Sequence, residues 1–298
     1  MRACTSILVA GFFSAAVAPV LAQEAMPSPP QTAEEKAALL DRVINNQKKS
    51  DAAQYLYERV ERVEVRKSGS DTQPAEVKIF RVVPAGTGID HIPVGPDGKP
   101  LDPVAYRADL EKLERALAWA AKDGHAQRDA YEKIAKKQKE RDDLIEATRT
   151  AFLYKYLSSE TRDGHVLFKY AIEPNPAFKP ATRAASIFTK VRGFVWIDPI
   201  AGELARVEGE VTGDISIGVF LGKIYEGSHF MQERYEVATG LWLPTFTQYD
   251  FDGRKFFLSV AIHNRTFYSQ YRRVGPPKEA LVIIRAELGK SVSATANP

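Results

Sequence analysis

Two runs of alternating apolar and polar residues flank a turn at residues 193–211, GFVWIDPIAGELARVEGEV. The turn contains Asp198-Pro199 and Gly202. Proline fixes φ, glycine permits a positive φ, and an aspartate side chain bonds readily to the amides of a turn, so this stretch predicts a β-hairpin. Trp196 comes just before the corner, where we expect it to pack against the sheet rather than to take part in chemistry.

The same strand-like pattern continues through most of the second half of the chain. Runs rich in β-branched and aromatic residues cover 152–161, 165–173, 222–237, 241–251 and 255–268. Asp163-Gly164, a dipeptide typical of tight hairpins, joins the first two. Two earlier runs, 55–67 and 75–83, also have strand character, although the alternation of the first slips near Arg59–Arg62 and suggests a bulge or a helix. We therefore predict an antiparallel meander of about 9–11 strands.

Alternation also predicts which face of this sheet is apolar. Val207 and Val211 share a face with Ala205 and Gly209, while glutamates and an arginine occupy the other face. The last run repeats the pattern, and a sheet with one apolar face must cover that face. We expect any apolar ligand to bind there. The candidate ligand-binding residues are Val207, Val211, Phe256, Leu258, Val260 and Ile262.

Helical patterns precede the meander and provide the cover for its apolar face. Thr32-Ala-Glu-Glu35 is a capping box, and the helix that it begins carries an apolar stripe to about residue 49. Asp102-Pro103 predicts the start of a second helical stretch, which Gly124 divides in two. We divide the chain into a signal peptide (1–22), a linker (23–31), an N-terminal helix with the first strands (32–102), a charged helical insertion (103–150), the β-meander of the same domain (151–275) and a C-terminal tail (276–298).

The N-terminus has the features of a secretory signal. Arg2 precedes a short apolar run, and Val20-Leu21-Ala22 places small residues at the positions that favour cleavage after Ala22. The only cysteine, Cys4, lies within this signal, so the mature chain has no disulfide or thiol chemistry. Without Arg2 the net charge is +2, from 40 basic and 38 acidic residues. Secretion without disulfides indicates a bacterial periplasm.

Motifs of catalysis and cofactor binding are missing from the sequence. There is no Gly-x-Ser-x-Gly, no phosphate-binding glycine loop, and no pair of histidines at metal-ligand spacing among the five in the chain. The near-balanced charge does not suggest nucleic acid. We therefore predict no catalytic residues, no metal, no cofactor and no enzymatic activity.

The hairpin at 193–211 resembles the β-meander of the LolA/LolB-like periplasmic lipoprotein carriers. A Trp-Ile-Asp strand end followed by a turn carries the resemblance, and GLWLPTFTQYDFDGRKFFLSVAI (240–262) is similar to the hairpins that come next. The resemblance covers about residues 151–275. It implies an α+β fold in which a highly curved, unclosed half barrel has helices over its concave face, and in which that face binds acyl chains.

Two functions fit these observations. The first is a monomeric periplasmic carrier or sensor of a lipid or an acylated protein, with peripheral membrane contact. Burial of an acyl chain is worth about 0.8 kcal/mol per methylene and needs no motif. The second is a non-catalytic envelope protein whose cavity is filled and whose charged helices dock a protein partner. An outer-membrane barrel is a less favoured alternative, because the helices and several strands are highly charged.

Overall fold

The computed structural model describes residues 27–66, 75–217, 222–255 and 258–295. The predicted signal peptide, Phe256 and the side chain of Leu258 lie outside this part. The helices are α1 (Ala33–Ala53), α2 (Pro103–Ala120), α3 (His125–Ala151) and α4 (Pro277–Thr295), with 3-10 turns η1 (Gln54–Leu56) and η2 (Ala185–Lys190). The strands are β1 (Tyr57–Arg66), β2 (Glu76–Pro84), β3 (Ile89–Pro93), β4 (Phe152–Arg162), β5 (His165–Pro174), β6 (Val191–Asp198), β7 (Glu203–Val211), β8 (Ile215–Ile217), β9 (Gly222–Ile224), β10 (His229–Ala238), β11 (Leu241–Lys255) and β12 (Leu258–Arg273).

All twelve described strands form one antiparallel sheet. Its order is β3-β2-β1-β12-β11-β10-β7-β6-β5-β4, with the short strands β8 and β9 attached beside β11. The last strand, β12, pairs with the first, β1, so the N-terminal hairpin joins the meander directly. β3 and β4 form the two edges and do not pair with each other, so the barrel is unclosed. The predicted α+β half barrel is confirmed, with one strand more than the range expected.

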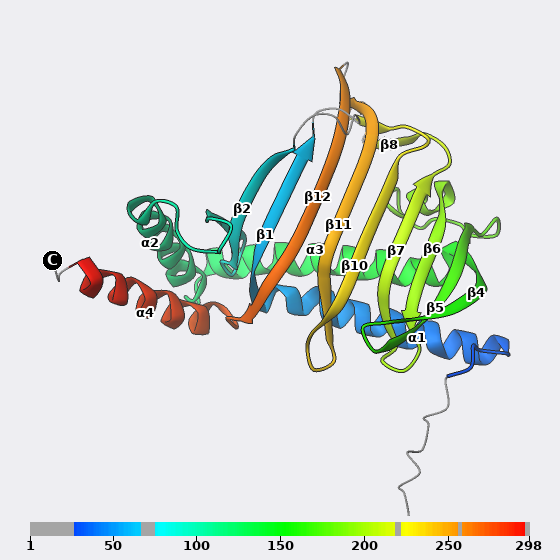
Figure 1. Cartoon of the computed structure of the whole chain (residues 1–298), viewed down its shortest axis with the longest axis horizontal. Helices are drawn as coiled ribbons and strands as arrows, with labels where there is room; N and C mark the ends of the chain where they lie inside the picture. Colours follow the sequence, from blue (N-terminus) through cyan, green and yellow to red (C-terminus); the bar gives the residue numbers. More distant parts are fainter. Residues whose placement is uncertain (1–26, 67–74, 218–221, 256–257, 296–298) are drawn as a thin grey trace, which may run out of the picture.

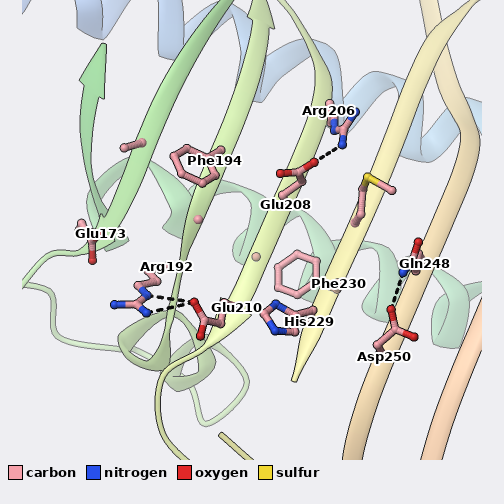
Figure 2. Close-up of a pocket in the computed structure, with 14 residues that line it drawn as sticks. Glu173, Arg192, Phe194, Arg206, Glu208, Glu210, His229, Phe230, Gln248 and Asp250 are labelled. Carbon is pink, nitrogen blue, oxygen red and sulfur yellow. Dashed lines mark hydrogen bonds and ion pairs between the residues drawn. The ribbon is translucent and has the colours of Figure 1, made fainter. Parts of the chain in front are cut away.

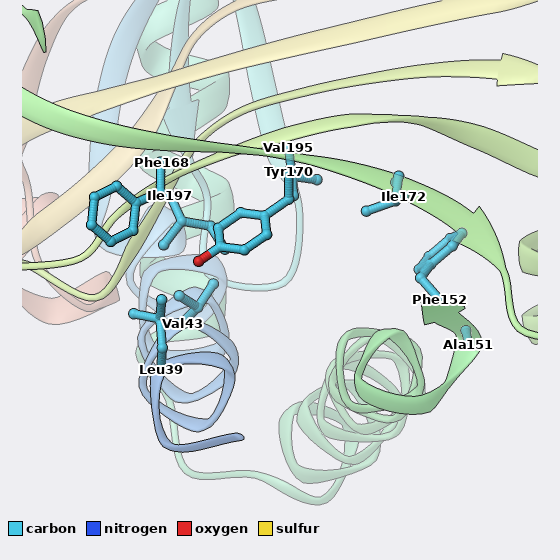
Figure 3. Close-up of a cluster of buried hydrophobic side chains, with 9 residues drawn as sticks. All are labelled: Leu39, Val43, Ala151, Phe152, Phe168, Tyr170, Ile172, Val195 and Ile197. Carbon is cyan, nitrogen blue, oxygen red and sulfur yellow. The ribbon is translucent and has the colours of Figure 1, made fainter. Parts of the chain in front are cut away.

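Helices α1 and α3 lie side by side across one face of the sheet (Figure 1). Thr32 caps α1 as predicted, because its hydroxyl accepts from the Glu35 amide while the Glu35 side chain accepts from the Thr32 amide. Leu39 and Val43, one turn apart, place the apolar stripe of α1 against the sheet. Figure 3 shows them beneath Phe168, Tyr170, Ile172, Val195 and Ile197 of strands β5 and β6.

A second core joins α2 and α4 to the β2–β3 end of the sheet. Leu110, Leu113 and Leu117 of α2 are fully buried and pack with Ala280 and Ile284 of α4. The prediction of a C-terminal tail over 276–298 is therefore wrong for residues 277–295, which form a helix. The apolar residues of α4 recur at helical spacing, and α2 supplies the surface that buries them.

Register shifts interrupt several strand pairs of the sheet, and those of β1 and β7 bear on the predicted pattern. β1 has its irregularity between Glu58 and Val60, at the start of the stretch Arg59–Arg62 where the alternation slips. In β7 the register shifts beside Trp196, so Ala205 packs with Trp196 on the outer face while Val207 faces the helices. The sequence pattern had placed Ala205 on the same face as Val207. A bulge inserts one residue and reverses the alternation, which accounts for the error.

Candidate functional site

An apolar cavity of about 200 Å³ lies between α1 and the sheet. We call it the covered cavity. Its only tyrosine hydroxyl belongs to Tyr154 and donates to the backbone oxygen of Thr148 (2.9 Å). Burial raises the pKa of Tyr154 to about 12, so this phenol stays neutral. The lining residues are Leu40, Val43, Ile44, Gln47, Thr148, Phe152, Tyr154, Ile172, Ile187, Phe188, Val191, Val195, Ile197, Leu204, Val207 and Phe230.

The structure separates the predicted ligand-binding residues along the sheet. Val207 lines the covered cavity, and the buried Val211 is the register partner of Val191, which also lines it. Val260 and Ile262 lie on the same face of the sheet as Val207. Register pairs lead from Val207 to Gln232, then to Thr247 and then to Thr266 of β12. Val260 and Ile262 are an even number of residues from Thr266 on β12, so they share its face. They line no part of the cavity, and Ile262 is 46% exposed. Leu258 begins β12, and Phe256 lies outside the described residues.

Helix α1 contributes lining residues that the sheet pattern did not identify. Leu40, Val43 and Ile44 lie on its apolar stripe and form one wall of the cavity. The sequence indicated the stripe as a core surface. Its use as a cavity wall depends on the distance between α1 and the sheet, which tertiary packing sets.

A second, polar chamber of about 280 Å³ adjoins the covered cavity at Gln47. We call it the polar pocket. Arg234 on β10 is almost completely buried in its wall, while Arg141 on α3 stands at a partly exposed position. Its lining residues are Gln47, Ser50, Asp51, Gln54, Arg141, Leu144, Ile145, Gln232, Arg234, Leu243 and Pro244.

The opposite face of the sheet carries a wider groove of about 620 Å³, shown in Figure 2. We call it the outer groove. Its charges are mostly paired: Arg192 Nη2 lies 3.1 Å from Glu210 Oε2, and Arg206 contacts Glu208 and Glu233. Paired charges on an exposed sheet face are typical of a solvated surface. The outer groove therefore has weaker features of a binding site than the covered cavity.

The side chains at the corner after β6 make contacts that shape the fold. Asp198 Oδ1 accepts hydrogen bonds from the amides of Ile200 and Ala201 (both 2.8 Å), and Gly202 has φ +68°. These contacts confirm the predicted hairpin corner. Arg42 and Asn46 of α1 donate to carbonyl groups of the turn, so the corner also fixes α1 over the sheet.

The described residues hold no group of three or more His, Cys, Asp or Glu side chains placed to bind a metal. None of the described helices has the length and apolar character needed to cross a membrane.

No family model matches the chain, and no curated protein matches it. Solved structures similar to it include an outer membrane lipoprotein-sorting protein domain from Vibrio parahaemolyticus (10% identity, TM-score 0.30, covering 78% of this chain and 93% of that one). Another is the LolA superfamily protein NE2245 from Nitrosomonas europaea (10% identity, TM-score 0.29, 79% and 96%). A third is a DUF1329 family protein from Desulfovibrio piger (10% identity, TM-score 0.28, 79% and 92%).

One of these structures is described as a LolA superfamily protein, and the sequence resembles that superfamily.

Proposed function

We propose that this chain is a periplasmic binding protein that holds an acyl chain of a lipid or a lipidated protein in the covered cavity. The observation that carries the proposal is the cavity itself, because its wall is almost entirely aliphatic and aromatic and its one phenol is already hydrogen bonded. Such a chamber offers a favourable environment to methylene groups and no charged group for catalysis. At about 200 Å³ it suits part of one chain rather than several.

The test is displacement of an apolar fluorescent dye, N-phenyl-1-naphthylamine, by n-alcohols of increasing length. Each added methylene that enters the cavity should tighten binding roughly fourfold, from about 0.8 kcal/mol per methylene. The gain should stop at the length where the tail fills the cavity. Absence of dye binding and of alcohol binding would refute the proposal and favour the alternative, an envelope interaction protein with a filled cavity.

Two matched variants locate the binding site. Val207→Trp places a large side chain in the covered cavity and should abolish dye binding. Ile262→Trp makes the same kind of change on the same face of the sheet, outside the cavity, and should leave binding intact. Circular dichroism melting checks that both variants fold. If Ile262→Trp alone weakens binding, the ligand lies on the open end of the sheet instead.

A further inference from the structure

The lining stripe of α1 changes character along the helix. Residues three to four apart lie on one face of a helix, so the stripe passes from the covered cavity into the polar pocket without a break. Gln47 lines both chambers. The apolar part of the stripe is Leu40, Val43 and Ile44. The polar part is Gln47, Ser50 and Asp51, and Gln54 at the start of η1 follows them.

The sheet and α3 make the same transition beside this stripe. Val207 of the covered cavity is the register partner of Gln232, which lines the polar pocket. Arg234 follows Gln232 by two residues on the same strand, and Thr148 and Ile145 of α3 lie on opposite sides of the boundary. The two chambers together therefore have an apolar end and a polar end, as an amphipathic ligand has.

Arg234 is the unusual group of the polar end. Its side chain lines the pocket although the residue is only 6% exposed. Nη2 donates to the backbone oxygen of Trp242 (2.7 Å), but Nε has no partner among the described residues. Burial lowers the pKa of this guanidinium, and the nearby carboxylates of Glu203 and Asp51 oppose that shift. A buried charge with an unused donor is costly unless an anion meets it.

Two carboxylates, Asp51 and Glu203, lie near enough to Arg234 to act on its charge. Asp51 lies 3.4 Å from Arg141 and accepts hydrogen bonds from Gln54 (2.9 Å) and Gln138 (3.0 Å). Glu203 is also buried, and desolvation raises its pKa to about 7, so near neutral pH it carries only part of a negative charge. Glu203 therefore compensates the charge of Arg234 only in part.

We propose that the polar pocket binds an anionic head group, a carboxylate or a phosphate, of a molecule whose acyl tail lies in the covered cavity, with the Arg234 guanidinium as the partner of that head group. This inference rests on the proposed function. Guanidinium groups bind both kinds of oxyanion through their planar N–H donors. The head-group chemistry does not depend on the length of the tail.

The experiment compares dodecanol, dodecanoate and dodecyl phosphate as competitors of N-phenyl-1-naphthylamine on the whole mature protein. A charge-assisted hydrogen bond should make at least one anion bind about 10- to 100-fold more tightly than the alcohol. Tighter binding of dodecanoate indicates a fatty-acid head, and tighter binding of dodecyl phosphate indicates a phospholipid-like head. Equal affinity for all three would overturn the inference and leave the proposed function intact. Failure of dodecanol itself would refute the proposed function.

Substitutions then assign the head group to Arg234. Arg234→Met should bring anion affinity down to the dodecanol affinity of the same variant, so that the preference for the anions disappears. Arg192→Met removes the same charge from the outer groove and should keep the wild-type preference. A preference that survives in a folded Arg234→Met protein would overturn the role of Arg234.

Arg234→Lys keeps the charge and provides a second test in case Arg234→Met does not fold. It lacks the planar pair of donors, so the ratio of anion affinity to dodecanol affinity should fall below that of the wild type. Wild-type anion affinity in this variant would overturn the role of the guanidinium.

Discussion

Asp198 and Glu203 face each other as register partners at the end of the β6–β7 hairpin, and both are buried, at 2% and 3% exposure. Their environments differ. Asp198 accepts hydrogen bonds from two backbone amides, and its Oδ2 lies 2.7 Å from His165 Nδ1. Oε2 of Glu203, in contrast, has no hydrogen-bond partner among the described residues. Desolvation accordingly raises the pKa of Glu203 to about 7, and the Asp198 carboxylate adds to this shift.

The raised pKa of Glu203 predicts a loss of stability between mildly acidic and neutral pH. A carboxyl whose pKa is higher in the folded state stabilises the fold below its unfolded pKa, and this contribution is lost as pH rises through the folded value near 7. We expect the free energy of unfolding to fall by roughly 1–3 kcal/mol between pH 5 and pH 8. Glu203→Gln should remove most of that slope in urea unfolding. Glu208→Gln on the outer face is the control, and equal slopes in the two variants would contradict the assignment.

Trp196 is predicted to be a packing residue whose loss destabilises the fold. It is 5% exposed, packs with Leu167, Ala205 and Trp242, and has Lys169 Nζ at 4.6 Å from its ring. Trp196→Ala should lower the free energy of unfolding by about 3–5 kcal/mol. Chemical denaturation measures this change.

Trp119 provides the matched control for Trp196. Its side chain is partly exposed on α2, so Trp119→Ala should cost about 1 kcal/mol or less. If Trp196→Ala unfolds at the wild-type denaturant concentration, the indole does not hold the hairpin in place.

The hairpin at residues 193–211 was predictable because its signals are local. Asp198 bonds to its own turn and Gly202 adopts a positive φ wherever such a turn occurs. The place of Ala205 was not predictable in this way, because a bulge in pairing depends on the neighbouring strand. Helix α4 was missed for a related reason, since the surface that buries Ile284 lies on α2, far away in the sequence.

The candidate site was predicted in part. Alternation in β7 identified Val207, which lines the covered cavity. The same rule selected Val260 and Ile262, because alternation identifies a face but not how far along it the helices extend. Arg234 carried no sequence signal. An arginine in a charged strand looks solvated, and only the packing of α1 and α3 over β10 buries it.

The signal-like N-terminal sequence predicts a mature protein with a defined N-terminus. Cleavage after Ala22 should give a periplasmic protein that begins at Gln23. N-terminal sequencing of protein from a periplasmic extract checks the cleavage position. Ala22→Arg places a large charged residue where a small one is required, so the precursor should accumulate uncleaved, while Ala25→Arg, beyond the cleavage position, should be processed normally. Recovery of a precursor-length wild-type protein from the extract would contradict this prediction.

Gly209 is predicted to control the shape of the covered cavity through Phe230. A Cβ atom at Gly209 would lie 2.2 Å from two ring carbons of Phe230, the register partner of this glycine. Phe230 lines both the outer groove and the covered cavity, so any displacement of its ring changes the wall of the covered cavity. Gly209→Ala should therefore weaken dodecanol binding and lower the free energy of unfolding by about 1–3 kcal/mol.

Two further variants test that explanation for Gly209. A Cβ at Gly213 would meet nothing within 4 Å, so Gly213→Ala should bind dodecanol as the wild type does. Shortening the ring in a Gly209→Ala/Phe230→Leu double variant should restore part of the binding, because the leucine leaves room for the new methyl group. Two substitutions in contact should show such coupling, whereas independent effects would simply add. Additive losses in the double variant would show that Gly209 acts on the cavity by some route other than the Phe230 ring.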